Sequence, residues 1–172
     1  MLHIIRLASL KGYLSAGWDA DLDLSRIEER ISPGVGTYVL ILYVARTKSL
    51  SIGSLGKHRL PPGYYAYVGS AFGPGGLRAR LTHHLKAWSE PHWHIDYLRR
   101  QADITEIWFS SGPVKQEHAW ARTCQSTPGV TIPAPYFGAS DCQCASHLFF
   151  FPEPVRVKLL RRLDSGDLRD CG

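Results

Sequence analysis

Residues 67–84 read YVGSAFGPGGLRARLTHH, and the rest of the chain can be organised around this stretch. An apolar run that ends at Gly69 predicts a strand, and the glycines that follow it predict a turn. A helix is expected to begin near Gly76, because apolar residues then recur at helical spacing and form its inner face: Leu77, Leu81, Leu85 and Trp88. Arg80 and His84 lie four residues apart, so they project from the same side of this helix.

Other apolar patterns predict further strands and helices. The run 38–45 is almost entirely apolar, as expected of a central strand that is covered on both faces. Further strands are predicted over residues 49–52, 64–68, 104–110 and 148–151, and helices over 24–31, 93–101 and 155–163 and in a segment that opens at Pro113. Together these elements predict a small α+β domain, whose mostly antiparallel sheet has about three main strands and is flanked by helices.

The charge of the chain is unevenly distributed. The 172 residues carry a net charge of +5, but no Asp or Glu occurs between Ile31 and Ser89. A field of one sign over a third of the chain suits a polyanionic partner such as nucleic acid. The basic residues singled out as candidate contacts are Lys57, Arg78, Arg80 and Lys86. The alternative is a basic, solvated surface that has no partner.

Neither a membrane span nor a secretory signal is predicted. No run of about 20 apolar residues is present, and the N-terminal segment is short and interrupted by His3 and Arg6. The four cysteines do not form the framework of a small secreted protein, because the chain is too long for that class. We expect a protein of the reducing cytoplasm that has no membrane partner. Its oligomeric state is not predicted.

Two tyrosine motifs in this order resemble a known family. Gly36-x-Tyr38 is followed by Tyr67-Val68-Gly69 and then by Arg80 and His84, and this set resembles the GIY-YIG nuclease superfamily. Residues 137–148 read FGASDCQCASHL and resemble its Uri-type branch. The resemblance divides the chain into an N-terminal extension (1–33), a GIY-YIG-like domain (34–152) and a basic C-terminal helix and tail (153–172). It implies a metal-dependent endonuclease that hydrolyses phosphodiester bonds in DNA, with RNA as an alternative substrate.

The resemblance also implies roles for particular residues. Tyr38 and Tyr67 match tyrosines implicated as general base and positioning group, and Arg80 matches an arginine that contacts phosphate. His84 matches a histidine of some branches, which shares the role of base or proton relay. Glu117 is the candidate ligand for a single Mg²⁺ or Mn²⁺ ion. Residues 39–66 separate the two tyrosines, a longer interval than is typical of the superfamily, so the strand register is left open.

A second metal site is suggested by the cluster Cys142-x-Cys144-x-x-His147. Two thiolates and an imidazole this close together can reach one Zn²⁺ ion. The fourth ligand would come from elsewhere, with His118 and Cys124 as the two candidates. The alternative is that these side chains only pack in the core.

Two further functions remain open beside the endonuclease. One is a nucleic-acid-binding module that keeps the fold without catalysis, and the other is a zinc-stabilised interaction domain.

Overall fold

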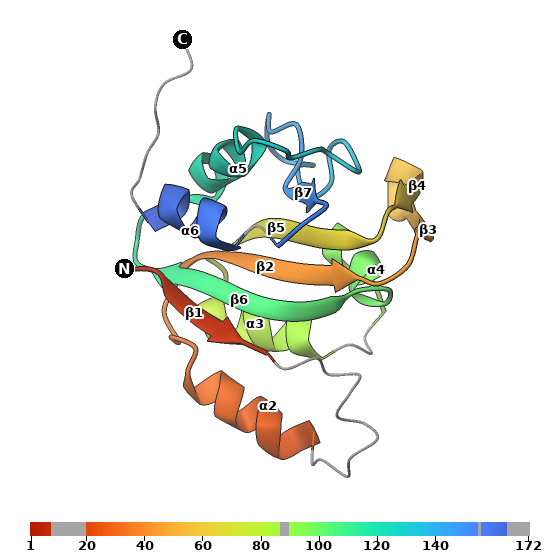
Figure 1. Ribbon diagram of the computed structural model, residues 1–172. Coiled ribbons are helices and arrows are strands. Elements are labelled where there is room, and N and C mark those ends of the chain that lie inside the picture. Colours follow the sequence, from red (N-terminus) through yellow and green to blue (C-terminus); the bar gives the residue numbers. More distant parts are fainter. Residues whose placement is uncertain (8–19, 87–89, 155, 165–172) are drawn as a thin grey trace.

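A five-stranded antiparallel sheet forms the centre of the protein (Figure 1). The computed structural model describes residues 1–7, 20–86, 90–154 and 156–164. The order of the strands across the sheet is β1 (His3–Arg6), β6 (Asp103–Ser111), β2 (Gly36–Val44), β5 (Gly63–Ala71) and β7 (Leu148–Phe151). A separate two-stranded ribbon consists of β3 (Lys48–Ile52) and β4 (Gly56–Leu60), joined by the short 3₁₀ helix η1 (Gly53–Leu55).

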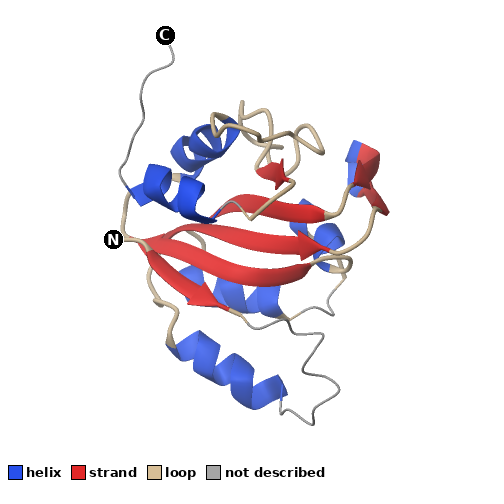
Figure 2. Cartoon of the chain, in the orientation of Figure 1, coloured by secondary structure: helices blue, strands red, loops and turns tan. Residues whose placement is uncertain are grey.

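Helices cover both faces of the sheet, as Figures 1 and 2 show. One face packs against α3 (Gly76–Leu85) and α4 (His94–Arg99), and α2 (Ala20–Glu29) packs against α3. The other face packs against α5 (Glu117–Gln125) and α6 (Arg156–Asp164). Among the described residues, no helix combines the length and the apolar character needed to cross a membrane.

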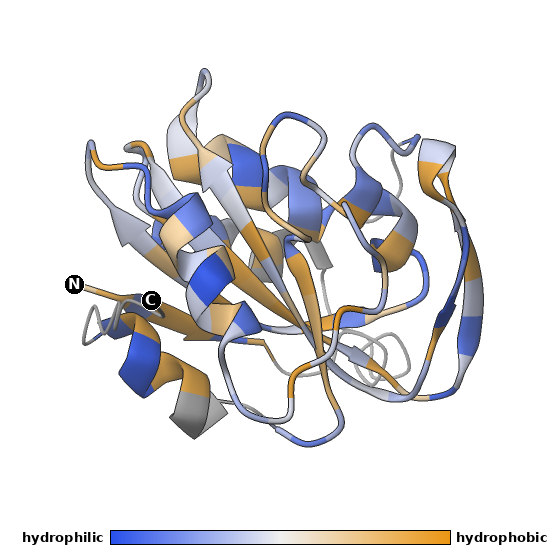
Figure 3. Cartoon of the chain, turned by 90° about the horizontal axis from the view of Figure 1, so that it is seen from above, coloured by the Kyte–Doolittle hydropathy of each residue, from blue (hydrophilic) through white to orange (hydrophobic). Residues whose placement is uncertain are grey.

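The alternation of side chains along β2 produces two hydrophobic cores. Tyr38, Leu40 and Leu42 point into the core on the α3 side, whereas Val39 and Ile41 point into the core on the α5 side. Because both faces are covered, the strand reads as one apolar run. Figure 3 shows such apolar strands between the more polar helices.

The pairing of β2 with β5 sets the positions of the two tyrosines. Tyr38 lies opposite Gly69, and Leu40 lies opposite Tyr67, so both tyrosines are on the same face of the sheet. The long interval between them contains the β3–β4 ribbon, which leaves the sheet after β2 and returns before β5. The sequence left the register between β2 and β5 open. In the structure the long interval forms a separate ribbon and does not interrupt this pairing.

The predicted α+β class is confirmed, but the sheet has five strands where about three main strands were expected. The unexpected strand is β1, which pairs with β6 along the edge of the sheet and buries Ile5. The predicted helix start at Pro113 is wrong. The helix begins at Glu117, because the preceding loop is held by Gln116 N, which donates a hydrogen bond to Thr37 Oγ1 over 3.0 Å. The predicted core residue Trp88 lies outside the described residues.

The last strand and the C-terminal helix lie close to where the sequence predicted them. The strand is β7, and its outer side forms a bridge with Thr131 through two backbone hydrogen bonds to Phe150, of 3.1 and 2.8 Å. The C-terminal helix is α6, and its Leu159 and Leu163 are buried against the α5 side of the sheet.

Replacement of Gly69 by alanine is expected to destabilise the protein by about 1–3 kcal/mol. An added Cβ would lie 2.5 Å from both Cζ and Oη of Tyr38, in a ring that is itself buried. Urea unfolding of Gly69→Ala against wild type measures the loss. Gly73→Ala is the control, because its Cβ would meet nothing within 4 Å, and a change within about 0.5 kcal/mol is expected there. Equal stability of the two variants would contradict the tight approach.

Candidate active site

The candidate site lies beside the C-terminal end of β5. Pairing with β7 reaches only as far as Tyr67, and the next residue, Val68, donates its N–H to the carbonyl of His147 over 2.9 Å. His147 is the residue immediately before β7. At this point β5, α3, the start of α5 and the loop before β7 come together, so side chains that are far apart in the sequence can meet.

Tyr38 and His84 form a buried hydrogen-bonded pair. Tyr38 Oη lies 2.7 Å from His84 Nε2. Burial, together with the charge of Tyr67, raises the pKa of Tyr38 well above its usual value. Burial, and then the charges of Arg99, His83 and Arg80, lower the pKa of His84 well below its usual value. The phenol is therefore protonated and donates, and the neutral imidazole accepts.

Tyr67 lies against this pair. Its ring centroid is 6.4 Å from that of Tyr38 and 6.4 Å from that of His84. Burial and then the negative charge of Glu117 raise the pKa of Tyr67, while the positive charge of Arg80 lowers it. The two tyrosines, His84, Arg80 and Glu117 thus form one electrostatically coupled group. Burial outweighs the nearby cation, so in the protein alone both phenols stay protonated.

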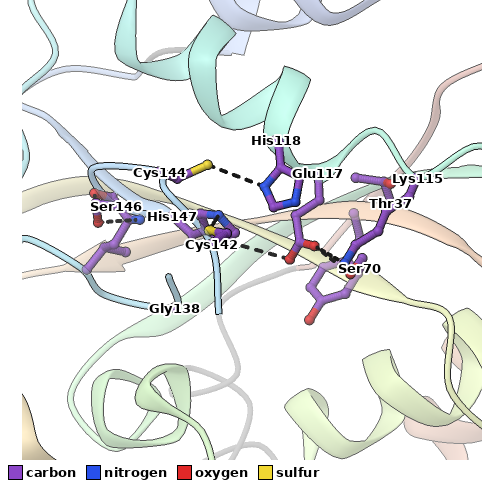
Figure 4. A network of polar contacts seen from close by, with 12 residues as sticks. Thr37, Ser70, Lys115, Glu117, His118, Gly138, Cys142, Cys144, Ser146 and His147 are labelled. Atoms are coloured by element: carbon purple, nitrogen blue, oxygen red, sulfur yellow. Dashed lines mark hydrogen bonds and ion pairs between the residues drawn. The ribbon is translucent and has the colours of Figure 1, made fainter. Parts of the chain in front are cut away.

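Glu117 is held by polar side chains from three segments (Figure 4). Its Oε2 accepts a hydrogen bond from Ser70 Oγ over 2.7 Å and lies 3.1 Å from Lys115 Nζ. Its Oε1 lies 3.5 Å from Nδ1 of the buried His147. Burial alone would raise the pKa of this carboxyl, but the polar contacts with His147, Ser70 and Lys115 and the charge of Lys115 lower it to about 2. Glu117 is therefore ionised at neutral pH.

Arg80 is half-buried, whereas the two tyrosines are buried. Its guanidinium carbon is 4.0 Å from the centroid of the Trp93 ring, which gives the flat cation a stacking surface. It lines a hollow between the glycine-rich turn and α4, formed by Ala71, Gly73, Pro74, Gly76, Ala79, Arg80, His83 and Trp93. A planar guanidinium at the wall of a hollow can bind a phosphate with two parallel hydrogen bonds.

The other predicted nucleic-acid contacts lie apart from this group. Lys57 is exposed on the β3–β4 ribbon, and Lys86 is exposed at the end of α3. Arg78 has a structural contact, because its Nε and Nη2 donate to the carbonyl of Ile31 over 3.2 and 3.1 Å. Its guanidinium is therefore tied to the segment after α2.

Three contributors were not found from the sequence. Ser70 and Lys115 hold Glu117, as described above. The third is Asp96, whose Oδ1 lies 3.4 Å from His83 Nε2 and 4.0 Å from His84 Nδ1. Asp96 follows two residues after His94 in the sequence, and no local pattern connects it with the tyrosines. Only Lys115 carried a usable signal, since it precedes the predicted metal ligand by two residues.

Within the part of the chain that the structure describes, two groups of side chains could hold a metal ion. One comprises His83, His84 and Asp96; the other comprises His118, Cys142, Cys144 and His147. Within each group the ligand atoms lie within 4.8 Å of one another. The second group contains Cys142, Cys144 and His147, the three ligands predicted from the sequence. Its fourth member is His118, whereas the other candidate for the fourth ligand, Cys124, is buried in the core on the α5 side.

The pH dependence of stability tests the protonation state of His84. Since folding lowers the pKa of His84, only the unfolded chain takes up this proton as the pH falls below about 6.5. The free energy of unfolding should therefore decrease from pH 7 to pH 5, and it should decrease less in His84→Gln, whose amide can still accept from Tyr38. Chemical unfolding at both pH values measures the difference. His92→Gln, a change of an exposed imidazole, should behave as wild type. An equally steep decrease in His84→Gln would show that another group is responsible.

Comparison with known proteins identifies a family for this chain. Residues 37–164 match a family described as a domain of unknown function, DUF123. No curated protein and no solved structure matches the chain significantly. The matched range begins within β2, includes all five residues of the candidate active site and ends with α6. The protein therefore belongs to the DUF123 family.

Proposed function

We propose that this protein is a metal-dependent endonuclease of the GIY-YIG type, which hydrolyses phosphodiester bonds in DNA. The observation that carries the proposal is the convergence of one coupled group from four elements. Tyr38 comes from β2, Tyr67 from β5, Arg80 and His84 from α3, and Glu117 from α5. These are the residue types, in the order along the chain, on which the resemblance to the superfamily rests.

The geometry of the group suits the orientation of a phenol and the binding of phosphate. Neutral His84 accepts a hydrogen bond from Tyr38 over 2.7 Å and so orients this phenol. Burial keeps both groups neutral in the protein alone, so Tyr38 would release its proton only when a bound cation stabilises the phenolate. Arg80 supplies a permanent positive charge beside both phenols, where charge develops on a phosphate in the transition state. Tyr67, protonated and beside Glu117, is suited to positioning or donating a hydrogen bond.

The carboxylate of Glu117 fits a divalent cation. It is ionised, its side chain is 12% exposed, and it already attracts the ammonium of Lys115 at Oε2. Mg²⁺ and Mn²⁺ accept a single carboxylate when water and phosphate complete the shell. When bound, such an ion supplies Lewis-acid stabilisation of the phosphate charge. It would also offset the negative charge by which Glu117 raises the pKa of Tyr67.

Substitution of the coupled group should remove cleavage. With Mg²⁺ or Mn²⁺ and a panel of branched, damaged, single-stranded and duplex DNA, each of Tyr67→Phe, Arg80→Ala and Glu117→Ala should cut at least about 10²-fold more slowly than wild type. The matched control for the tyrosine is Tyr65→Phe, which alters a phenol two residues away that donates to Pro61 O. The control for the carboxylate is Glu90→Ala, at an exposed position.

The same panel separates the proposal from its main alternative. Three variants that cut as fast as wild type would show that the group is not the active site. A wild-type protein that binds DNA but never cuts it, with either metal, would identify a non-catalytic binding module.

DNA affinity should decrease steeply as salt increases, because binding to phosphates releases counterions. Lys57→Ala and Lys86→Ala should each lower the log–log slope by about one and weaken all sequences similarly. Fluorescence anisotropy titrations in metal-free buffer measure the slope without cleavage. Arg161→Ala is the control, since this exposed residue lies on α6, on the other face of the sheet. A slope that neither lysine alters would exclude the acid-free stretch as the DNA-binding surface.

A further inference from the structure

Four potential metal ligands meet between the first turn of α5 and the loop before β7 (Figure 4). We call them the Cys₂His₂ cluster: His118, Cys142, Cys144 and His147. His118 Nδ1 lies 3.3 Å from Cys144 Sγ, and His147 Nε2 lies 3.5 Å from Cys142 Sγ. Both thiols and His118 are half-buried, whereas His147 is buried.

Two nitrogen–sulfur spacings in the cluster match those of a tetrahedral zinc site. Zn–S bonds of about 2.3 Å and Zn–N bonds of about 2.0–2.1 Å place nitrogen and sulfur about 3.5 Å apart around one ion. The two nitrogen–sulfur distances in the cluster are 3.3 and 3.5 Å. Two thiolates and two neutral imidazoles balance the charge of one Zn²⁺ ion and leave no open position, as in a structural site. Thiolates also select against Mg²⁺, which prefers oxygen ligands.

The loop that carries three of the ligands is fixed by its own hydrogen bonds. Tyr136 N donates to Ala145 O over 2.7 Å, and His147 N donates to Phe137 O over 2.8 Å. Ser146 Oγ donates to Ala134 O and accepts from Leu148 N, each over 3.0 Å. The ligands are thus preorganised with respect to β7, and the contribution of an ion would be to join this loop to α5.

His147 also connects the cluster with Glu117. Its Nε2 faces the thiol of Cys142, and its Nδ1 lies 3.5 Å from Glu117 Oε1. When Nε2 binds a metal, the proton must be on Nδ1, a buried nitrogen that has no other hydrogen-bond partner and lies within ion-pair distance of the Glu117 carboxylate. Carboxylate–histidine–metal arrangements of this kind fix the tautomer and the orientation of the ring.

We propose that the Cys₂His₂ cluster binds one structural Zn²⁺ ion, which holds His147 as a positioning residue for Glu117. The zinc site itself stands independently of the proposed nuclease activity; only the effect on catalysis through Glu117 rests on it. Because His118 directly follows Glu117, the ion would fix the first turn of α5 from two sides. It would coordinate the side chain of His118, which belongs to that turn. It would coordinate His147 as well, and this histidine lies beside the Glu117 carboxylate.

Metal analysis tests the site directly. Protein purified without chelator and reconstituted with Zn²⁺ should contain about one zinc per chain, the stoichiometry of a closed four-ligand site. Cys142→Ser and His118→Asn should each lose it, and Gln143→Ala, an exposed residue between the two cysteines, should keep it. Co²⁺ added to metal-free wild type should give the visible and thiolate charge-transfer bands of a tetrahedral site. This arm needs no variant, so a poorly folding variant leaves the test intact.

Two results would overturn the proposal. One is wild type that takes up neither Zn²⁺ nor Co²⁺ while its thiols are reduced. The other is zinc that persists in the Cys142→Ser/Cys144→Ser double variant. A Cys142–Cys144 disulfide found by mass spectrometry in freshly purified protein would count equally against it.

The connection to Glu117 has a readout that does not depend on cleavage. In the zinc-loaded protein, ¹⁵N–¹H correlation of the histidine rings should show His147 with its proton on Nδ1 and a metal on Nε2. Removal of zinc should abolish this state and lower the melting temperature by several degrees. If the proton is on Nε2 in zinc-loaded protein, the positioning role is wrong.

The nuclease assay then separates the two proposals. If both hold, Cys142→Ser should raise the Mg²⁺ concentration needed for half-maximal cleavage, whereas Gln143→Ala should not. An unchanged Mg²⁺ requirement in zinc-free Cys142→Ser would overturn the effect on catalysis. Zinc-loaded wild type that never cuts would refute the proposed function and leave the zinc site standing.

Discussion

The architecture depends on one close approach, that of the Tyr38 ring over Gly69, where β2 pairs with β5. The absence of a side chain at Gly69 leaves room for the phenol in the position from which it reaches His84 on α3. Because side chains alternate along a strand, a slip of one residue would turn Tyr38 toward the α5 face and away from the histidine. The same register places Tyr67 beside Tyr38 and Ser70 beside Glu117. Fold and candidate chemistry are therefore set by the same pairing.

A second constraint is the contrast in charge state among neighbouring buried groups. Burial keeps Tyr38 and His84 neutral; it outweighs the charge of Arg80 at the tyrosine, and the same charge reinforces it at the histidine. Glu117 is kept ionised by three polar neighbours. A site that must exchange a proton and also attract a cation needs both conditions within one cavity. Here they are produced by deep burial of Tyr38 and His84 and by the polar neighbours of the less buried Glu117.

The sequence predicted those parts of the fold that local pattern determines. Strands covered on both faces, such as β2, read as apolar runs, and the helix α3 followed from its leucine spacing. Strand β1 was missed because its four residues, HIIR, have polar ends and are too few to show a period. The start of α5 was misplaced because Pro113 is a favourable first-turn residue, whereas the actual start is determined by a hydrogen bond to distant Thr37.

The same distinction applies to the candidate site. Its principal residues were identified by their order along the chain, and the structure brings them together. The choice of His118 over Cys124 depended on which side of α5 faces the loop, which residue spacing alone did not settle. Ser70 and Glu117 are 47 residues apart, and no local rule pairs them. Contacts of this range arise from the topology of the sheet, so they become visible only once the strand order is known.

The two outer strands of the sheet have a consequence for the behaviour of the protein at high concentration. β1 and β7 are each four residues long, and the outer side of β7 is bridged by Thr131. Long, flat, open edges are templates on which another chain can add a strand, and short or covered edges prevent this. A protein whose central strands are among its most apolar segments thus presents little of their backbone to its neighbours. Lengthening β1 would remove this protection and favour self-association through the edge next to β6.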